Sequence, residues 1–394
     1  MLMQKIKQLS KENYSCVKEI RRHIHMNPEL SFCEYETSKY IVHKLNEIGL
    51  NCRVDFANNG VVAIIDGKDP NRKCVALRAD IDALPIQEEN NIEYKSKNNG
   101  VMHACGHDVH TASLLGVARI LNAIRDEFTG TIKLIFQPAE EKNPGGAIGM
   151  IQAGVLENPK VNTIMGQHVD PLIPVGKVGF KSGVSMASAD ELYITVHGKG
   201  EHAASPHTAI DPIFIASSII IALQQIVSRN CNPILPSVLS ICQINAGEAT
   251  NIIPNKVKIA GTFRTVDENW RFKAHEKMKS LACTLASAMG GSCDFDISTG
   301  YPMLHNDFDL TKRLTKSAQN YIGFENVVEK NLTMGAEDFA YYAQKLPGCF
   351  YQLGIQNNDK GINSGLHTPT FNIDETALEI SPGLMAWMAI EEMK

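Results

Sequence analysis

The chain has 394 residues, of which 44% are hydrophobic, and its 38 Lys and Arg residues are nearly balanced by 43 Asp and Glu residues. This length exceeds what one hydrophobic core comfortably holds, so we expect two domains. The charge balance gives no bulk positive field for nucleic acid or an anionic membrane, which leaves a small molecule or a peptide as the expected ligand.

The sequence also argues against export and membrane insertion. The first residues scatter Lys and Gln among apolar side chains and lack the apolar core and cleavage site of a signal peptide. The longest apolar stretch, residues 213–223, is shorter than the ~20 residues of a membrane-spanning helix. The 10 cysteines form no CxxC pair and are expected to be free thiols in a reducing compartment. We therefore expect a soluble, cytoplasmic protein.

Short apolar runs alternate with helical patterns in the first part of the chain. Strands are predicted at residues 74–77, 131–136 and 161–166, and a helix is predicted over 109–124. Strands that alternate with helices are typical of a mostly parallel α/β sheet. The same pattern returns near the C-terminus, with predicted helices over 309–321, 336–344 and 376–390 and a strand over 350–353.

The middle of the chain has a different order of elements, βαββαβ, which is typical of a ferredoxin-like sandwich. We interpret residues 185–298 as an inserted second domain, and residues 1–184 and 299–394 as one discontinuous α/β domain. The elements expected in the insert are strands at 191–196, 238–245, 257–264 and 293–297 and helices over 212–229 and 270–289.

Polar side chains gather where the predicted strands of the α/β sheet end. Ligands of open α/β sheets bind beyond the carboxyl ends of the strands, so function is expected there. The residues at these positions are Arg78, Asp80 and Asp82 after the first strand, Glu140 and Glu141 after the second, Gln167 and His168 after the third, and Cys105, His107, Asp108 and His110 before the helix.

A Cys, several His and carboxylates on one edge of a sheet match the sulfur, nitrogen and oxygen ligands of a Zn- or Mn-class metal. Any one of these histidines alone would more often be structural, but their joint placement favours a metal site. Glu140 and Glu141 are adjacent acids beside Pro138 and are expected to point in different directions. One could then bind metal while the other carries a proton, the alternative being a solvated acidic turn.

At this point the sequence resembles the metallopeptidase-like amidohydrolases, which include aminoacylases, hippurate hydrolase and the hydrolases of indole-acetyl amino acids. The resemblance covers nearly the whole chain. It rests on the ordered motifs RRHIHMNPELSFCEYET, RADIDALP, HACGHDVHTASLLG, FQPAEE, GQHVDP, GKGEHAASPH, NIIP, GTFRT, MGAEDFAYY and GLHTP.

The resemblance implies a metal site and a catalytic acid. Two divalent ions, Zn, Mn, Co or Ni, would be held in it, and Glu140 would act as general acid/base. Peptidases of the wider superfamily usually carry His where this chain has Arg78. Asp80 would then orient a ligand, and Asp82 would be structural only. The ligands implied by the resemblance are Cys105, His107, Glu141, His168 and His367.

The inserted domain contributes three more residues by resemblance. His202 would stabilise an oxyanion, Asn251 would contact substrate, and Arg264 would pair with the substrate carboxylate. The insert would act as a lid, and a homodimer would form through it, since ferredoxin-like sheets have exposed edge strands.

The implied reaction is hydrolysis of the amide bond of N-acyl-L-amino acids, which releases a carboxylic acid and a free amino acid. Which acyl group and which amino acid are preferred stays open. An exopeptidase or dipeptidase would use the same site, although Arg78 argues against it. A catalytically silent scaffold is a further alternative, but it would have no use for Glu140 beside a full set of ligands.

Overall fold

The computed structural model describes residues 1–394, apart from the side chain of Asp55. The chain forms two compact units. Unit 1 comprises Met1–Ser185, His305–Leu332 and Asp338–Lys394, and unit 2 comprises Met186–Leu304 and Thr333–Glu337.

Unit 1 is built on an eight-stranded mixed sheet with the order β1-β2-β4-β3-β5-β16-β6-β15. Its central strands β4, β3, β5 and β16 run parallel to one another, as the alternation of strands and helices predicted. Every residue of β3 and β4 is buried, because helices and loops cover both faces of the sheet. The strands are β1 (Cys52–Phe56), β2 (Gly60–Asp66), β3 (Cys74–Asp80), β4 (Thr131–Gln137), β5 (Thr163–Pro174), β6 (Val178–Phe180), β15 (Val327–Glu329) and β16 (Gly348–Gln356).

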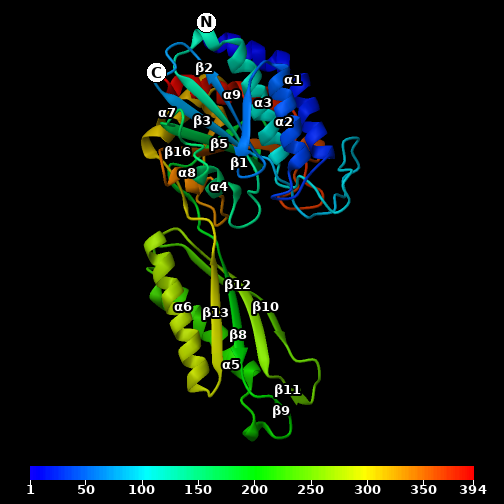
Figure 1. Ribbon diagram of the computed structural model, residues 1–394, viewed down its shortest axis with the longest axis vertical. Helices are drawn as coiled ribbons and strands as arrows, with labels where there is room; N and C mark the ends of the chain where they lie inside the picture. The colour runs from blue at the N-terminus through cyan, green and yellow to red at the C-terminus, as the bar shows by residue number, and fades with distance from the viewer. The chain divides into compact units, whose positions relative to one another are not determined.

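The helices α1, α3 and α9 of unit 1 pack against one another, and α7 packs against α9 (Figure 1). Helix α7 begins where the Asp307 side chain accepts a hydrogen bond from the backbone N–H of Leu310. The helix expected over residues 336–344 is only Ala340–Ala343, and Asp338 before it binds Arg78 of β3 and Gln137 of β4. The helices are α1 (Leu2–Met26), α2 (Tyr35–Glu47), α3 (His107–Ala123), α4 (Gly146–Gln152), α7 (Phe308–Ile322), α8 (Ala340–Ala343) and α9 (Ala377–Glu392), with short η1 (Arg125–Glu127), η4 (Phe324–Asn326) and η5 (Asn358–Lys360).

Unit 2 has its own antiparallel sheet with the order β10-β12-β8-β13, and α5 and α6 lie side by side along it (Figure 1). Alternate residues of β8, such as Leu192 and Ile194, point into a separate hydrophobic core. The elements are β8 (Asp190–His197), β9 (Glu201–His202), η2 (Pro206–Thr208), α5 (Pro212–Gln225), η3 (Ile226–Asn230), β10 (Ser237–Ala246), β11 (Ile252–Ile253), β12 (Lys256–Thr265), α6 (Glu268–Ala288) and β13 (Ser292–Thr299). A separate pair of strands is formed by β7 (Gly183–Met186) and β14 (Leu304–Asn306).

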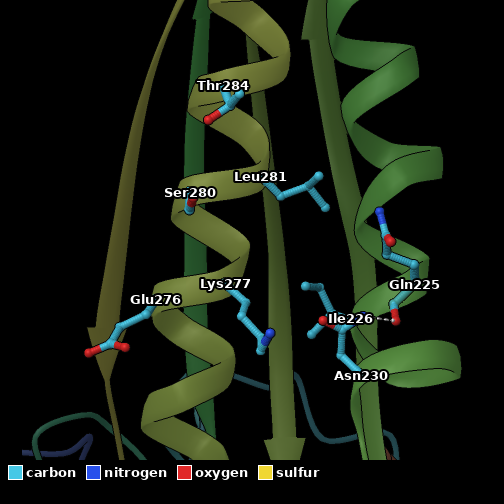
Figure 2. A pocket seen from close by; sticks show the side chains of 8 residues that line it. All are labelled: Gln225, Ile226, Asn230, Glu276, Lys277, Ser280, Leu281 and Thr284. Atoms are coloured by element: carbon cyan, nitrogen blue, oxygen red, sulfur yellow. Dashed lines mark hydrogen bonds between the residues drawn. The ribbon is translucent and has the colours of Figure 1, made fainter.

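A π-helical turn, η3, extends α5 beyond the apolar stretch noted in the sequence. The resulting helix, Pro212–Asn230, is long and apolar enough to cross a membrane, with a mean hydropathy of 1.4 over 18 residues. One side of it, including Ile215 and Leu223, is buried in the core of unit 2. A surface pocket lies between this turn and α6 (Figure 2), and no candidate site residue lines it. Its lining residues are Gln225, Ile226, Asn230, Glu276, Lys277, Ser280, Leu281 and Thr284.

Candidate metal centre

The carboxyl ends of three neighbouring parallel strands position the candidate ligands of unit 1. Strand β3 ends at Asp80, β4 leads into Glu140 and Glu141, and β5 carries His168. Cys105 and His107 lie at the same edge of the sheet, where α3 begins with His107. The sheet therefore brings together residues that lie far apart in the sequence.

The five residues expected to bind metal form one cluster. The Cys105 sulfur lies 3.4 Å from Nε2 of His168 and 3.2 Å from Nε2 of His367. Oε1 of Glu141 lies 3.3 Å from Nε2 of His367 and 3.7 Å from Nε2 of His107. Two groups with all ligand atoms within 4.8 Å of one another, Cys105 with His107 and His168, and Cys105 with Glu141 and His367, could each hold an ion.

The donor set fits a divalent metal. Thiolate, imidazole and carboxylate are the ligands of Zn- and Mn-class ions. Nε2 of His107 is buried and has no hydrogen-bond partner among the described residues, although the other ring nitrogen has one. A metal ion bound to this nitrogen would account for its missing hydrogen-bond partner, since the other potential ligands lie around it.

Two histidines of the cluster are oriented by their second ring nitrogen. Nδ1 of His107 donates to Oδ1 of Asp82 at 3.1 Å, and Nδ1 of His168 donates to the carbonyl of Val169 at 2.7 Å. Both rings thus turn Nε2 toward the cluster. Asp82 also accepts a hydrogen bond from the backbone N–H of Glu141 at 2.9 Å. The expectation that Asp82 is structural only was therefore wrong, since it orients two candidate ligands.

His110 lies beside the cluster, but both of its nitrogens are engaged. Nδ1 donates to Oδ1 of Asp80 at 2.6 Å, and Nε2 accepts from the backbone N–H of Val169 at 2.9 Å. Asp80 thus orients His110, and His110 in turn holds the backbone N–H of Val169, the residue after His168. The role of His110 was not evident from the sequence, because motif spacing does not show which ring nitrogen is occupied.

Arg78 is buried and binds three acceptors. Its Nη1 donates to Oδ2 of Asp80 at 2.6 Å, Nη2 donates to Oδ1 of Asp338 at 2.7 Å, and Nε donates to Oε1 of Gln137 at 3.0 Å. Asp338 was missed in the sequence because it falls within the segment expected to be helical. One guanidinium therefore joins two buried carboxylates next to the cluster.

The side chains of the adjacent acids Glu140 and Glu141 both lie near Nε2 of His107. Oε2 of Glu140 is 4.0 Å from Nε2 of His107, and Oε1 of Glu141 is 3.7 Å from the same atom. Both face the cluster, whereas the sequence predicted different directions. The preceding residue, Ala139, has a left-handed φ of 53°, and Asp82 holds the N–H of Glu141, so the turn curls both side chains inward.

The backbone at Gly106 allows Cys105 and His107 to face one centre. Gly106 has a left-handed φ of 81°, and a Cβ there would lie 2.4 Å from Cγ2 of Val169. His367 also has a left-handed φ, 58°, and its N–H donates to the carbonyl of Ala104 at 2.9 Å. That bond places the late loop beside Cys105.

The cluster has an excess of negative charge. Burial raises the pKa of the Cys105 thiol well above its ordinary value, and Glu141 adds to the rise. Burial by itself would lower the pKa of His107, but the neighbouring carboxylates, led by Asp80, raise it to about 10. Both directions are consistent with a site that would bind a divalent cation.

The three candidates of unit 2 are not all brought together. His202 lies in β9 and pairs with Ile252, and Ala203 donates its N–H to the carbonyl of Asn251 at 3.0 Å, so His202 and Asn251 are neighbours. Arg264 lies near the opposite end of β12, where its Nη1 donates to the carbonyl of Met334 at 3.2 Å.

The comparisons with known proteins decide the family. Residues 76–389 match the model described as peptidase family M20/M25/M40. The chain belongs to this family. It is therefore a hydrolase that acts on amide bonds, as the resemblance implied.

Relatives of this M20 chain are similar over nearly their whole length. It is 40% identical over 393 residues to thermostable carboxypeptidase 2 of Saccharolobus solfataricus, covering 99% of this chain and 98% of that protein. It is 41% identical over 359 residues to N-acetyl-L-cysteine deacetylase of Bacillus subtilis, covering 91% and 84%. A Bacillus subtilis structure described as a dinuclear metal binding peptidase from the M20 family matches with a TM-score of 0.83 and 37% identity, over 96% of this chain and 98% of that one.

Proposed function

We propose that the protein uses two divalent metal ions per subunit to hydrolyse the amide bond of N-acyl-L-amino acids, releasing a carboxylic acid and a free amino acid. The observation that carries the proposal is the convergence of Cys105, His107, Glu141, His168 and His367, with Glu140 beside them. The similarity to a deacetylase of an N-acetyl amino acid and to a dinuclear metal-binding peptidase supports it.

The two adjacent acids would divide the work. When bound, the metals would polarise the amide carbonyl and lower the pKa of a water molecule. Glu141 lies 3.3 Å from Nε2 of His367, whereas Glu140 lies 4.0 Å from Nε2 of His107, so Glu141 would be the ligand and Glu140 the proton carrier. Glu140 would take the proton from water during attack on the carbonyl and pass it to the departing nitrogen.

His202 would stabilise the oxyanion as a neutral hydrogen-bond donor. Its Nδ1 accepts from the backbone N–H of Ala204 at 3.1 Å, so the ring proton resides on Nε2. An Nε2–H directed at a developing negative charge is worth more in the transition state than in the ground state. Asn251 would contact the substrate, and Arg264 would bind its carboxylate through the planar guanidinium.

Unit 2 would be a ferredoxin-like lid through which a homodimer forms, with the insert at residues 185–298. Its βαββαβ order and strand order β10-β12-β8-β13 support this reading. The exposed edge strand β10, with Val238 and Ile244 on its surface, offers a place for pairing. Because His202 and Arg264 lie at opposite ends of unit 2, one lid would serve two active sites.

The proposal also extends to the metal and the compartment. Cys105 favours Zn over Mg by softness, while the carboxylate and imidazole ligands accept Mn, Co or Ni. All 10 cysteines are free thiols, which supports a reducing, cytoplasmic location.

A carboxypeptidase activity is the second candidate, supported by the relative named thermostable carboxypeptidase 2. A peptide with a free C-terminus also presents an amide near a carboxylate, so Arg264 would serve both substrates. The two activities differ in what stands on the acyl side of the amide, an amino acid or a simple acyl group.

One substrate panel tests both. Protein reconstituted with Zn, Mn, Co or Ni is assayed with acetyl and benzoyl derivatives of several L-amino acids and with dipeptides that share the same C-terminal residue. We expect the largest kcat/KM for an N-acyl amino acid and none after chelation. Higher values for the dipeptides would favour the second candidate, and no hydrolysis of either class with any metal would contradict both.

A further inference from the structure

Oδ2 of Asp80 lies between Arg78 and the face of the cluster. It accepts from Nη1 of Arg78 at 2.6 Å and lies 3.8 Å from Nε2 of His107, the nitrogen that faces the metal position. Asp80, His107 and His110 also have ligand atoms within 4.8 Å of one another. By position alone, Asp80 is thus a candidate sixth ligand.

Arg78 is held firmly against that oxygen. Its side chain is fully buried, and its other donors bind Asp338 and Gln137. Asp338 is fixed in turn, because it also accepts from Nε2 of Gln137 at 2.8 Å and from the N–H of Ala147 at 2.9 Å. A guanidinium with its donors engaged in a rigid fork cannot swing away from Asp80 without breaking several buried bonds.

The second carboxylate oxygen of Asp80, Oδ1, binds a different partner. Oδ1 accepts from Nδ1 of His110 at 2.6 Å, and His110 supports the backbone of Val169 next to His168. The carboxylate is therefore divided between a histidine on one oxygen and an arginine on the other. If Arg78 were absent, Oδ2 would be a buried anionic oxygen without a hydrogen-bond donor, 3.8 Å from Nε2 of His107, and a metal ion held at the proposed site would satisfy it.

We propose that Arg78 is a positioning residue that keeps Asp80 out of the metal coordination sphere. The inference rests on the metal site of the proposed function. It adds that Arg78 limits the number of protein ligands at that site. Catalytic metal sites keep a position open for water or substrate, and a further carboxylate would fill it. Arg78 thereby preserves the open position without touching substrate or metal.

The test uses full-length protein loaded with Co(II), whose visible absorption weakens when the coordination number rises. In Arg78→Met/Asp338→Asn, Asp80 is the one carboxylate that loses a bond to Arg78, since the second acid is neutralised; Gln137, which also loses its bond to Arg78, is a neutral amide. We expect a weaker visible band than in the wild type and a loss in kcat larger than any change in KM. Adding Asp80→Asn to this variant should restore the band, because an amide is a poor replacement for the carboxylate ligand.

Lys133→Met is the matched control. Lys133 is a buried cation on β4 of the same sheet, and its Nζ donates to three backbone carbonyls, those of Val155, Glu157 and Pro159. Its loss should lower thermal stability and leave the Co(II) band unchanged. Arg78→Lys, which cannot reproduce the fork, is measured in parallel in case the double variant does not fold, and it should weaken the band in the same direction.

The outcomes separate the inference from the proposed function. If the wild type binds no Co(II), the proposed metal site itself is wrong. If it binds Co(II) but the folded Arg78 variants keep the wild-type band, or if Asp80→Asn fails to restore a weakened band, the positioning role of Arg78 is overturned.

Discussion

Asp82 binds the side chain of His107 through one carboxylate oxygen and the backbone N–H of Glu141 through the other, at 3.1 and 2.9 Å. It therefore fixes two candidate ligands from different elements, the start of α3 and the loop after β4. Loss of a group that orients metal ligands typically lowers metal affinity by about 10- to 100-fold, so we expect this for Asp82→Ala. Competition with a chromogenic chelator measures it. Glu392→Ala, which removes a buried carboxylate paired with Lys73, is the control and should leave the affinity unchanged.

The second prediction concerns the adjacent acids. Glu140→Gln should retain both metals and lose activity by roughly 10²- to 10⁴-fold, the usual contribution of a general acid/base. Glu141→Gln should lose metal, because Oε1 lies among His107 and His367. Elemental analysis of the two purified variants compares them directly. Equal metal loss would reject the division of roles.

The third prediction concerns Arg264. A charge-assisted hydrogen bond is worth about 1.5–3 kcal/mol, so Arg264→Ala should lower kcat/KM for the free acid by roughly 10- to 150-fold. It should leave the carboxamide analogue nearly unaffected, which erases the preference for the acid. Lys258→Ala, an exposed cation on the same strand, is the control for a general charge effect. An unchanged acid-to-amide preference in Arg264→Ala would mean that another group binds the carboxylate.

The fourth prediction is a pH dependence of unit 2. Burial raises the pKa of Asp190, but its bonds to His275 and Arg271 outweigh this, so the folded pKa is lower than the ordinary value. A lowered carboxyl pKa stabilises the fold above the unfolded pKa of about 3.9, and this contribution is lost as the pH falls through the folded pKa. Stability of unit 2 should therefore decline below about pH 4.

Asp190→Asn should remove much of this acid dependence and cost about 1–3 kcal/mol at neutral pH, because Arg271 loses one buried carboxylate while it keeps Glu268 and the carbonyl of Gly300. Urea titrations that follow the fluorescence of Trp270, in a background where Trp387 is replaced by Phe, report on unit 2 alone. Asp294→Asn, which removes an exposed acid paired with His197, is the control. A neutral-pH stability equal to that of the parent would contradict the prediction.

The fifth prediction tests whether His202 acts across a dimer. Glu140→Ala and His202→Ala are each expected to be inactive. If they are unfolded together and refolded, about half of the dimers are mixed, and each mixed dimer has one intact site when His202 acts in trans. About a quarter of the wild-type activity should then return. If mass spectrometry shows mixed dimers and the mixture stays inactive, His202 acts within its own chain.

The sequence predicted the parts of the fold that depend on local pattern. Continuous apolar runs identified β3, β4 and β5, and the polar residues that follow β4 and β5 or precede α3 identified Glu141, His168 and His107 as neighbours. These predictions succeed because parallel strands of one sheet end at one edge.

The remaining features depend on contacts that local pattern does not encode. His367 came from the family resemblance alone, since its place is set by a backbone bond to Ala104. The orienting roles of Asp82 and His110 depend on which oxygen meets which ring nitrogen. The sequence pattern places Asp338 within a predicted helix, although its bond to Arg78 fixes it to the sheet.

The close approach at Gly106 has a consequence for how freely this segment can vary. An alanine at position 106 would be strained by the left-handed φ, and its Cβ would clash with the side chain of Val169. Removing the clash would require a shift of Cys105 or His107. In a library of all single substitutions selected for activity, we therefore expect position 106 to accept glycine alone. Gly100, which also has a left-handed φ but has open space around its Cβ position, should accept asparagine. Two glycines with similar backbones would thus differ sharply in mutational tolerance, because only one of them lies between two candidate metal ligands.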